Sequence, residues 1–274
     1  MFLTDAQSQY VAEYCALLRA ALAQEKDGEH VIDMDAVADA VGKDIEKPAF
    51  YYTEESQQKK FNCDACGAFN DILGRFCYCS NCGSRNDLHE LQVDTLAKLR
   101  THADDSGGYD AIVSDAVGAF DTFTSQYVKQ LVQRIPLRSA RKARLARMRF
   151  HNLRTVATEL KAGFDIDILE GLSAEEVAFA ELLFHRRHVY EHNGSVTDEK
   201  YMTDSGDISV RLGQTIHESQ VSAHRLIGLV NKTAENLHRQ FHDIFPPEAE
   251  PIARQNERKA WRAKRQTAPQ AKKA

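Results

Sequence analysis

The chain of 274 residues is long enough for one large or two modest domains, and its 43% hydrophobic and 27% charged residues are typical of an ordinary soluble protein. No stretch approaches the roughly 18 apolar residues of a membrane span, and the first 26 residues carry acids where a secretory signal is basic and apolar. Six cysteines in such a chain favour a metal site over disulfides. We therefore expect a cytoplasmic protein with no membrane partner.

Residues 1–60 are expected to form an N-terminal helical region. Apolar residues recur at helical spacing over Thr4–Lys26, and Cys15 lies on that apolar face, which favours a core position over a role as metal ligand. A shorter helix is predicted around Asp35–Val41, because Gly42 follows it. Up to residue 62 the chain holds twelve acidic and six basic residues, within a formal net charge of −5. This acidic region could dock another protein or belong to the bundle.

Residues 61–86 contain two Cys-x-x-Cys-Gly motifs separated by twelve residues. Tetrahedral zinc needs four thiolates at about 2.3 Å, and a tight turn through each motif brings two thiolates together. The glycine after each motif permits the left-handed backbone that lets amides approach the sulfurs. We assign the zinc ligands as Cys63, Cys66, Cys79 and Cys82, because this choice uses both motifs. The segment resembles the zinc ribbon family over its full short length.

Cys77 is the remaining cysteine of this segment. It alternates with Cys79 along a presumed strand, so it could replace a ligand or lie near the metal. Four thiolates leave no open coordination position, so we expect structural and not catalytic zinc. A ribbon that contacts nucleic acid is the functional alternative, but we favour a metal clamp for a piece too small to have its own core.

Residues 87–107 are predicted as a connecting helix, Asp87–Thr101, followed by a loop rich in Asp, Ser and Gly that marks a domain boundary. A helical bundle is expected over residues 108–245. Its first two helices are predicted over Tyr109–Arg134, which Pro136 follows, and over Ser139–Lys161, with a turn over Phe164–Leu172.

Residues 134–158 hold eight basic residues and no carboxylate. A charged run is usually a solvated helix face, but such faces normally mix signs. Charge of one sign at this density is costly unless a polyanion or an acidic protein lies against it. We therefore predict a contact with a phosphate backbone, made by Arg138, Arg141, Lys142, Arg144 and Arg147.

The next helix is predicted over Ala174–Asn193. Ser173 and Glu176, three residues apart, have the form of a capping box, and Gly194 suits the left-handed residue that closes a helix. The helix is apolar around much of its circumference, so we expect it in the middle of a bundle or between two bundles. Ionisable groups carried into such a place are costly unless they are paired or used.

Arg187, His188 and His192 lie in the last turns of this helix. At about 100° per residue, the two histidines share a face, whereas Arg187 points about 140° from His192. Aiming Arg187 and His192 at one phosphate therefore requires the helix end, the long arginine side chain or a second protomer. The structural alternative is an ion pair between Arg187 and Glu191, with the histidines capping carbonyls.

The run Arg-His-Val-Tyr-Glu-His at residues 187–192 resembles the signature of the HEPN superfamily: an Arg, a small polar residue or His, three residues and a His. The resemblance covers roughly the second half of the chain and extends by residue to Arg187, His188 and His192. It implies a mainly α fold, an up-and-down helical bundle. Together with the two Cys-x-x-Cys-Gly motifs, this predicts a small zinc ribbon of short β-strands inserted after the N-terminal helices. The resemblance also implies a homodimer whose paired Arg and His form a metal-independent RNA-cleaving site.

Such an endoribonuclease uses the 2′-hydroxyl of RNA as the nucleophile, so it must remove that proton, stabilise the phosphorane and protonate the 5′-oxygen. We expect His192 to be the general acid or base, since an unperturbed histidine has a pKa of about 6.5. Arg187 would hold the phosphate oxygens bidentately, and His188 would handle a second proton or orient the first group. We expect Asn193 to be a further RNA contact and Tyr190 to be another supporting donor.

The last long helix is predicted over Gln214–Phe245, and Ser195–Gly213 as an ordered loop or short hairpin. The basic tail, residues 246–274, is expected to be disordered and to adhere to RNA. Two other functions stay open. One is a non-catalytic RNA-binding or regulatory protein. The other is a scaffold that docks a regulatory or antitoxin protein in a defence or toxin system.

Overall fold

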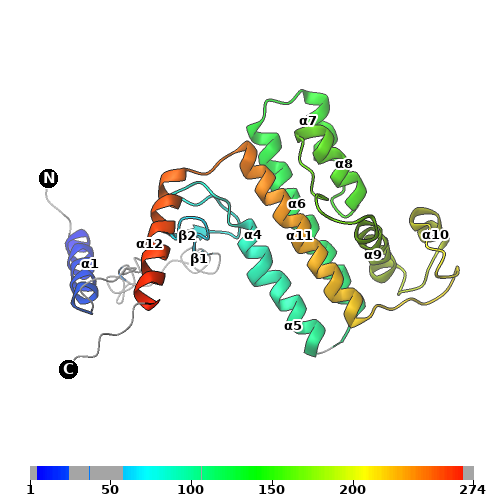
Figure 1. Ribbon diagram of the computed structural model, residues 1–274, viewed down its shortest axis with the longest axis horizontal. Helices are drawn as coiled ribbons and strands as arrows, with labels where there is room; N and C mark the ends of the chain where they lie inside the picture. Colours follow the sequence, from blue (N-terminus) through cyan, green and yellow to red (C-terminus); the bar gives the residue numbers. More distant parts are fainter. Residues whose placement is uncertain (1–4, 25–36, 38–57, 106, 268–274) are drawn as a thin grey trace. The chain divides into compact units, whose positions relative to one another are not determined.

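The structure is a computed structural model that describes residues 5–24, 37, 58–105 and 107–267. Their fold is mainly helical with one small antiparallel sheet (Figure 1), which confirms the prediction of a mainly α fold with a small β element. The chain divides into two units, the described parts of Met1–Asn62 with Ala68–Arg75, and Cys63–Gly67 with the described parts of Phe76–Ala274.

The first unit contains helix α1 (Asp5–Gln24) and the strands β1 (Gln58–Asn62) and β2 (Phe69–Leu73). The strands pair antiparallel, from Gln58 opposite Leu73 to Asn62 opposite Phe69. The helix agrees with the apolar spacing in the sequence, whereas the helix predicted around Asp35–Val41 lies outside the described residues except for Val37. The chain between the paired strands is the first Cys-x-x-Cys-Gly motif.

The second unit opens with a helical stretch that changes form along its length. It begins as α4 (Asp87–His89), continues as the π-helical turn η1 (Glu90–Leu96) and ends as α5 (Ala97–Asp105). The next helix, α6 (Tyr109–Arg134), has the predicted bounds.

A break divides the single helix predicted over Ser139–Lys161 into α7 (Ser139–Ala146) and α8 (Leu153–Phe164). Asn152 starts the second helix, because its side chain accepts a hydrogen bond from the amide of Thr155 at 2.9 Å. Met148 and Phe150, between the helices, pack against the core. Burying these two side chains requires a change of direction that helical periodicity does not reveal.

The motif helix α9 (Ala174–His192) begins with the predicted capping box. After it, the expected loop contains a short helix, α10 (Glu199–Ser205), and Val196 and Thr215 form an isolated antiparallel bridge. Helix α11 (Gln220–Ile244) starts later than predicted, because Ser219 caps it.

The C-terminal stretch differs from the expectation of disorder, because α12 (Ala249–Thr267) is helical over most of it. Its composition explains the difference: although charged, it is rich in Ala, Arg, Gln and Lys, all of which are good helix formers.

Helix α6 occupies the centre of the second unit and packs against α5, α9 and α11. Tyr127 stacks edge-on against Phe241 of α11 at 4.9 Å between ring centroids, and Phe120 meets Phe184 of α9 at 5.2 Å. Each such buried side chain contributes roughly 1.5–3 kcal/mol through burial. This packing fixes the orientation of α9 and therefore of the motif that its last turns carry.

Candidate metal centre and candidate catalytic face

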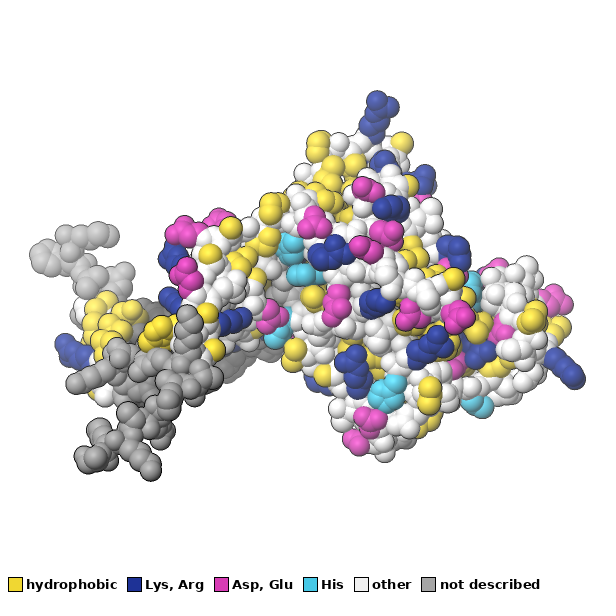
Figure 2. Space-filling model, in the orientation of Figure 1, with side chains coloured by type: hydrophobic (Ala, Val, Ile, Leu, Met, Phe, Trp, Pro, Cys, Tyr) yellow, Lys and Arg dark blue, Asp and Glu magenta, His cyan; other side chains and the backbone are white. Residues whose placement is uncertain are grey.

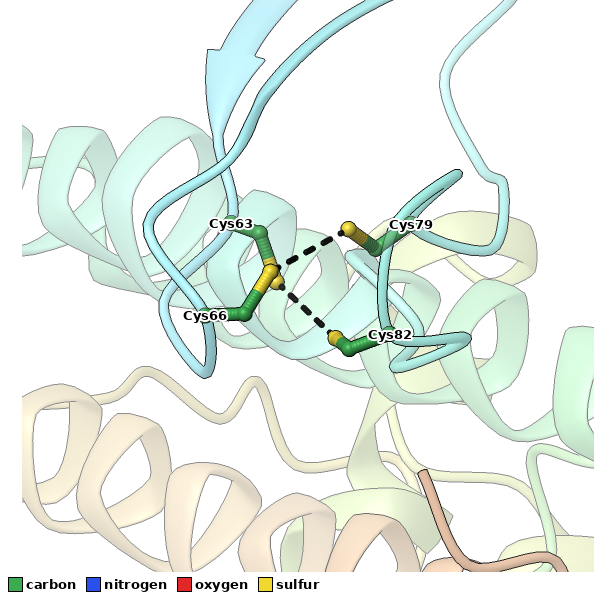
Figure 3. Close-up of side chains that lie close together, drawn as sticks. All are labelled: Cys63, Cys66, Cys79 and Cys82. Carbon is green, nitrogen blue, oxygen red and sulfur yellow. Dashed lines mark hydrogen bonds between the residues drawn. The ribbon is translucent and has the colours of Figure 1, made fainter. Parts of the chain in front are cut away.

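Four buried cysteines, Cys63, Cys66, Cys79 and Cys82, form a compact cluster in the second unit (Figure 3). Their sulfurs all lie within 4.8 Å of one another, with 3.7 Å between Cys63 and Cys82 and 3.6 Å between Cys66 and Cys79. Four thiolates at about 2.3 Å from a tetrahedral metal lie about 3.8 Å apart. The predicted ligand set is thus brought together in a geometry compatible with a metal site.

The backbone of each motif turns tightly around its cysteines. Gly67 donates its amide hydrogen to Cys63 O at 2.7 Å, and Gly83 donates to Cys79 O at 2.9 Å. Both glycines have positive φ, 69° and 75°, where a Cβ is strained. Burial raises the pKa of the Cys63 thiol to about 11. A bound cation would favour the thiolate that this burial disfavours.

The two other cysteines do not join this cluster. Cys77 is half-buried, and burial raises the pKa of its thiol. Its amide hydrogen binds Asn86 Oδ1 at 2.8 Å, which holds the chain beside the second motif. Cys15 is half-buried on α1 in the first unit. Cys77 is therefore near the cluster without belonging to it.

The second motif is tied to the helical bundle by a buried arginine. Arg85 binds Asp87 through both ends of its guanidinium fork, at 2.9 and 2.7 Å, and its amide donates to His242 Nε2 of α11 at 3.2 Å. Its guanidinium also lies over the ring of Tyr127, 5.4 Å from the centroid. The hydroxyl of Tyr127 lies 2.7 Å from His238 Nδ1. The cysteine cluster and the bundle core thus share one network.

Arg187 and Glu191 form an ion pair one turn apart on α9. Arg187 Nε lies 2.9 Å from Glu191 Oε1, and Nη2 lies 2.8 Å from Oε2. The pairing that the sequence allowed as a structural alternative is therefore present. The same carboxylate also approaches His192, whose Nε2 lies 3.9 Å from Glu191 Oε2.

A guanidinium and an imidazole from one helix consequently face a common anionic oxygen. The long arginine side chain bridges the angle of about 140° that separates the two positions on the helix. His188 adds a second imidazole, because its ring lies edge-on to that of His192 with 4.9 Å between centroids. The side chain of His192 is 59% exposed, so a large ligand can reach this face.

The predicted supporting donors are engaged within the chain. Asn193 gives its side-chain amide to Asp198 Oδ2 at 2.6 Å, where it fixes the turn that follows α9. The hydroxyl of Tyr190 donates to Glu218 Oε1 at 2.6 Å, and the pKa of this tyrosine is raised by burial and by that hydrogen bond. Both side chains hold the surroundings of the motif in place.

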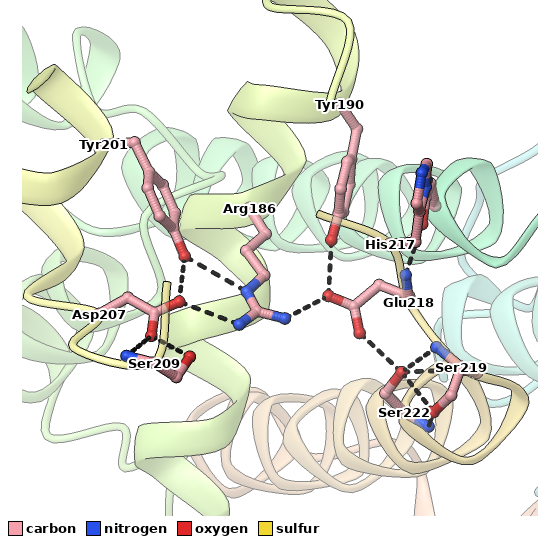
Figure 4. A network of polar contacts seen from close by, with 10 residues as sticks. Arg186, Tyr190, Tyr201, Asp207, Ser209, His217, Glu218, Ser219 and Ser222 are labelled. Atoms are coloured by element: carbon pink, nitrogen blue, oxygen red, sulfur yellow. Dashed lines mark hydrogen bonds and ion pairs between the residues drawn. The ribbon is translucent and has the colours of Figure 1, made fainter. Parts of the chain in front are cut away.

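Sequence reasoning missed Arg186, which is the best-anchored charge on α9 (Figure 4). Its guanidinium lies 2.9 Å from Asp207 Oδ2 and 2.9 Å from Glu218 Oε1, and both carboxylates are almost fully buried. Tyr201 gives its hydroxyl hydrogen to Asp207. Burial alone would raise the pKa of the Asp207 carboxyl, but hydrogen bonds from Ser209, Tyr201 and Arg186 hold it well below its usual range. An arginine within an apolar run was the available signal.

The positive charge of residues 134–158 is partly neutralised by acidic side chains of other helices, which the sequence did not lead us to expect. Arg144 binds Glu159 of α8 at 2.9 Å, and Arg154 binds Glu181 of α9 at 2.6 Å. Arg141 donates to Ala162 O at 3.0 Å. The acids come from helices that follow in sequence, so the local run conceals them. Figure 2 shows basic and acidic side chains interspersed on the visible face of the bundle.

Arg138, Lys142 and Arg147 are exposed on α7 and at its two ends. Their contact with a phosphate backbone stays a prediction.

A cavity of about 620 Å³ opens beside the motif, between the start of α8, the middle of α9 and α10. His188 lines it, together with His185 of the preceding turn. Its other polar lining residues carry both signs, while Leu182 and Phe184 supply apolar wall. The candidate catalytic face and this cavity therefore share His188.

Comparison of the chain with family models, curated proteins and solved structures finds no match. Among the described residues, no helix has both the length and the apolar character needed to cross a bilayer.

Proposed function

We propose that this chain is a metal-independent endoribonuclease of the HEPN type, with Arg187, His188 and His192 as its catalytic residues. The observation that carries the proposal is the oxygen Glu191 Oε2, which Arg187 Nη2 and His192 Nε2 face at 2.8 and 3.9 Å. A phosphate oxygen carries the same kind of charge. This shared approach to one anionic oxygen supports a role for both side chains on a phosphodiester, once Glu191 turns away.

The chemistry follows from the properties of these groups. One imidazole takes the proton of the 2′-hydroxyl as this oxygen attacks phosphorus, and the other gives a proton to the departing 5′-oxygen. The Arg187 guanidinium stabilises the phosphorane through two parallel N–H donors. Bond formation and cleavage leave a 2′,3′-cyclic phosphate and a 5′-hydroxyl. The edge-on contact between His188 and His192 supports this division of roles.

The proposed enzyme is a homodimer with α9 at the interface. Few of the motif's side chains are fully buried within one protomer, and Arg187 and His192 remain partly or largely exposed. A two-fold axis beside α9 would place two such sets around one phosphate. The exposed Arg138, Lys142 and Arg147 would hold the flanking RNA backbone.

The four-cysteine centre is proposed to hold structural zinc. Thiolates in a tetrahedral arrangement favour zinc over harder cations, and the closed set has no position for a substrate. Zinc would therefore stabilise the second motif and its link to α11 without entering the reaction.

The test is incubation of the purified protein with labelled RNA in excess EDTA. Cleavage products should end in 2′,3′-cyclic phosphate, and Arg187→Ala or His192→Ala should reduce the rate by at least about 100-fold. Glu175→Ala, an exposed change at the start of the same helix, is the matched control and should leave the rate unchanged. RNA binding without cleavage by the wild-type protein would overturn the proposal.

That outcome would favour a second candidate, a non-catalytic RNA-binding or regulatory protein. The specific observation behind it is the two-point pairing of Arg187 with Glu191, which satisfies the guanidinium within the chain. In such a protein the pair would only stabilise the last turn of α9.

A further inference from the structure

The cavity of about 620 Å³ beside His188 has more positive than negative side chains in its lining. Its charged lining residues are three cations and two carboxylates: Arg149, Arg154, Lys200, Glu181 and Asp204. Histidines of α9 and of the segment before α8 line the same space. The fixed charge of the lining is therefore positive, which favours an anionic ligand.

The two carboxylates leave one of the cations without an acidic partner. Glu181 Oε2 lies 2.6 Å from Arg154 Nη2, and Asp204 pairs with Lys200 one turn away on α10. No carboxylate in the part of the chain that the structure describes pairs with Arg149, which is exposed between α7 and α8. A guanidinium carries five N–H donors in a planar fork that matches the oxygens of a phosphate. Arg149 is therefore available for an anion in the cavity.

Arg154 can contribute as well, because its pair with Glu181 uses only part of its guanidinium. The Arg154 side chain is 73% exposed, and an exposed ion pair contributes little to stability. A phosphate that enters the cavity can therefore bind the remaining N–H donors of Arg154 while Glu181 keeps its contact with Nη2.

The start of α8 and one face of α9 add to this environment. Residues 152–155, the N-cap and first turn of α8, belong to the lining, and a helix N-terminus carries a partial positive charge. On α9, burial lowers the pKa of His185, so that its imidazole is neutral at neutral pH and keeps one N–H donor. Both features support the arginines in attracting an anion.

The cavity has room for more than an inorganic ion. Its volume lies within the usual range for pockets that hold one small organic ligand. Leu182 and the buried Phe184 supply apolar wall on the side of α9. A ligand that suits both parts of the lining carries a phosphate group on an organic body.

We infer that this cavity binds a phosphate monoester of nucleotide size, with Arg149 and Arg154 as the principal ligands of the phosphate. A monoester carries a charge between about −1.5 and −2 at pH 7, so it gains more from two guanidinium groups than a backbone diester does. Such a group has two sources, a free mononucleotide and the phosphorylated 5′ end of an RNA strand. The inference goes beyond the proposed function, because binding a phosphate requires no cleavage.

Calorimetric titration of the purified protein with AMP tests the site, and adenosine, which lacks the phosphate, is the matched ligand. The wild-type protein should bind AMP at least about tenfold more tightly than adenosine. Arg149→Ala should weaken AMP binding about tenfold, as expected for lost hydrogen bonds between charged groups, and should leave adenosine binding unchanged. Arg100→Ala removes an exposed arginine of α5 outside the lining and should keep the affinity for AMP.

Two further variants locate the phosphate on the protein. Ala178→Trp places a large side chain in the lining and should weaken AMP binding with every cation still in place. Arg187→Ala should keep the affinity for AMP, because Arg187 does not belong to the lining. AMP binding that is lost in Arg187→Ala and kept in Arg149→Ala would place the phosphate at the proposed reaction centre and overturn the inference.

Non-cleavable RNA separates the two sources of the phosphate. The probes are 2′-O-methyl oligonucleotides with fluorescein at the 3′ end and either a phosphate or a hydroxyl at the 5′ end, measured by fluorescence anisotropy. A 5′-phosphate that tightens binding to the wild-type protein but not to Arg149→Ala supports the RNA end as the ligand. AMP binding with no effect of the 5′-phosphate supports the free nucleotide.

The phosphate site fails on results that do not depend on nuclease activity. Equal binding of AMP and adenosine, together with no effect of the 5′-phosphate, would overturn it in a protein that cleaves RNA and in one that does not. AMP binding that survives both Arg149→Ala and Ala178→Trp would overturn it as well. Binding of AMP that depends on Arg149 in a protein that never cleaves RNA would refute the nuclease and support the phosphate site.

Discussion

Arg186 and Arg187 follow one another on α9, but their guanidinium groups have different surroundings. Arg186 lies between the buried carboxylates of Asp207 and Glu218, whereas Arg187 pairs with Glu191, which is itself partly exposed. A buried charge that loses its partner costs several kcal/mol, while an exposed pair contributes little. The first arginine therefore holds the segment after α9 in place, and the second is available for exchange with a ligand.

Replacing each arginine by methionine should separate these roles. We expect Arg186→Met to lower the free energy of unfolding by about 3 kcal/mol, because two buried carboxylates lose their cation. We expect Arg187→Met to lower it by less than about 1 kcal/mol. Urea unfolding followed by circular dichroism measures both. Equal losses of stability would show that the Arg186 network stabilises the protein no more than the Arg187–Glu191 pair does.

His238 should make the stability of the bundle depend on pH. Burial, with the nearby His242 and Arg85, lowers the pKa of His238 from 6.5 to about 3. Below pH 6.5 the histidine of the unfolded chain binds a proton, whereas the buried histidine of the folded chain stays neutral. The free energy of unfolding that is present above pH 6.5 is therefore lost as the pH falls towards 3. The loss should reach about 1.4 kcal/mol per pH unit for this group.

Urea midpoints between pH 7 and pH 4 (chosen to bracket roughly the titration of histidine) measure this slope. His238→Asn keeps an acceptor for the Tyr127 hydroxyl but has no titrating ring, so it should flatten the profile. The matched control is His217→Asn, which changes an exposed histidine that lies before α11 and contacts Asp110. This control variant should keep most of the change in stability with pH. A slope that His238→Asn does not change would assign the pH dependence to other groups.

Local sequence was sufficient to predict the cysteine cluster but not the Arg186 network. Each Cys-x-x-Cys pair lies within one tight turn, so spacing alone brings its sulfurs together. The partners of Arg186 lie 21 and 32 residues further along the chain, on a segment whose path depends on tertiary packing. The role of Arg186 therefore does not stand out until the fold is known.

The helix boundaries show the same division at the scale of elements. The start of α9 was predicted because Ser173 and Glu176 form a local capping box. The break between α7 and α8 was missed, because it depends on Met148 and Phe150 reaching the core. The compensation of Arg144 and Arg154 was missed for a similar reason, since their acids lie on other helices.

Zinc content should depend on the four clustered cysteines alone. We expect about one zinc per chain after anaerobic purification, since closed four-thiolate sites bind strongly. Cys79→Ser should lose most of the metal, and Cys15→Ser should keep it. Metal analysis of the three proteins measures this. Less than about half an equivalent in the wild-type protein would contradict the zinc assignment.

Loss of the metal should also lower the thermal stability of the helical bundle outside the cysteine motifs. Arg85 follows the second motif closely and binds Asp87 and His242 within the bundle. Thermal unfolding of Cys79→Ser, followed through its helical signal, should therefore begin at a lower temperature than that of Cys15→Ser. Identical transitions would show that the motif and the bundle unfold independently.

At the scale of the whole molecule, a dimer would place like charges face to face. Two copies of Arg187 and His192 around one axis repel, so an anion bound between them should tighten the assembly. Sedimentation at micromolar protein, with and without sulfate or RNA, should show more dimer when the anion is present. A monomer that cleaves RNA under all of these conditions would mean that one chain builds the complete site.

Mixing two inactive variants tests the shared site directly. Arg187→Ala and His192→Ala protomers can together restore one intact set across a two-fold axis if each active site draws residues from both chains. The mixture should then cleave RNA faster than either variant alone. Independent sites would leave the mixture as inactive as its components.

In the proposed enzyme, Glu191 competes with the substrate for Arg187 and His192. Its carboxylate occupies the position that a phosphate oxygen would take between Arg187 and His192, so every substrate must first displace a ligand that is present at high effective concentration. Glu191→Gln removes the charge of this competitor and should lower KM several-fold while kcat changes little. Short RNA, with few phosphates to offset the displacement, should gain more from the substitution than long RNA. The Glu191 carboxylate would then make the enzyme select long RNA, because small phosphate esters could not displace it.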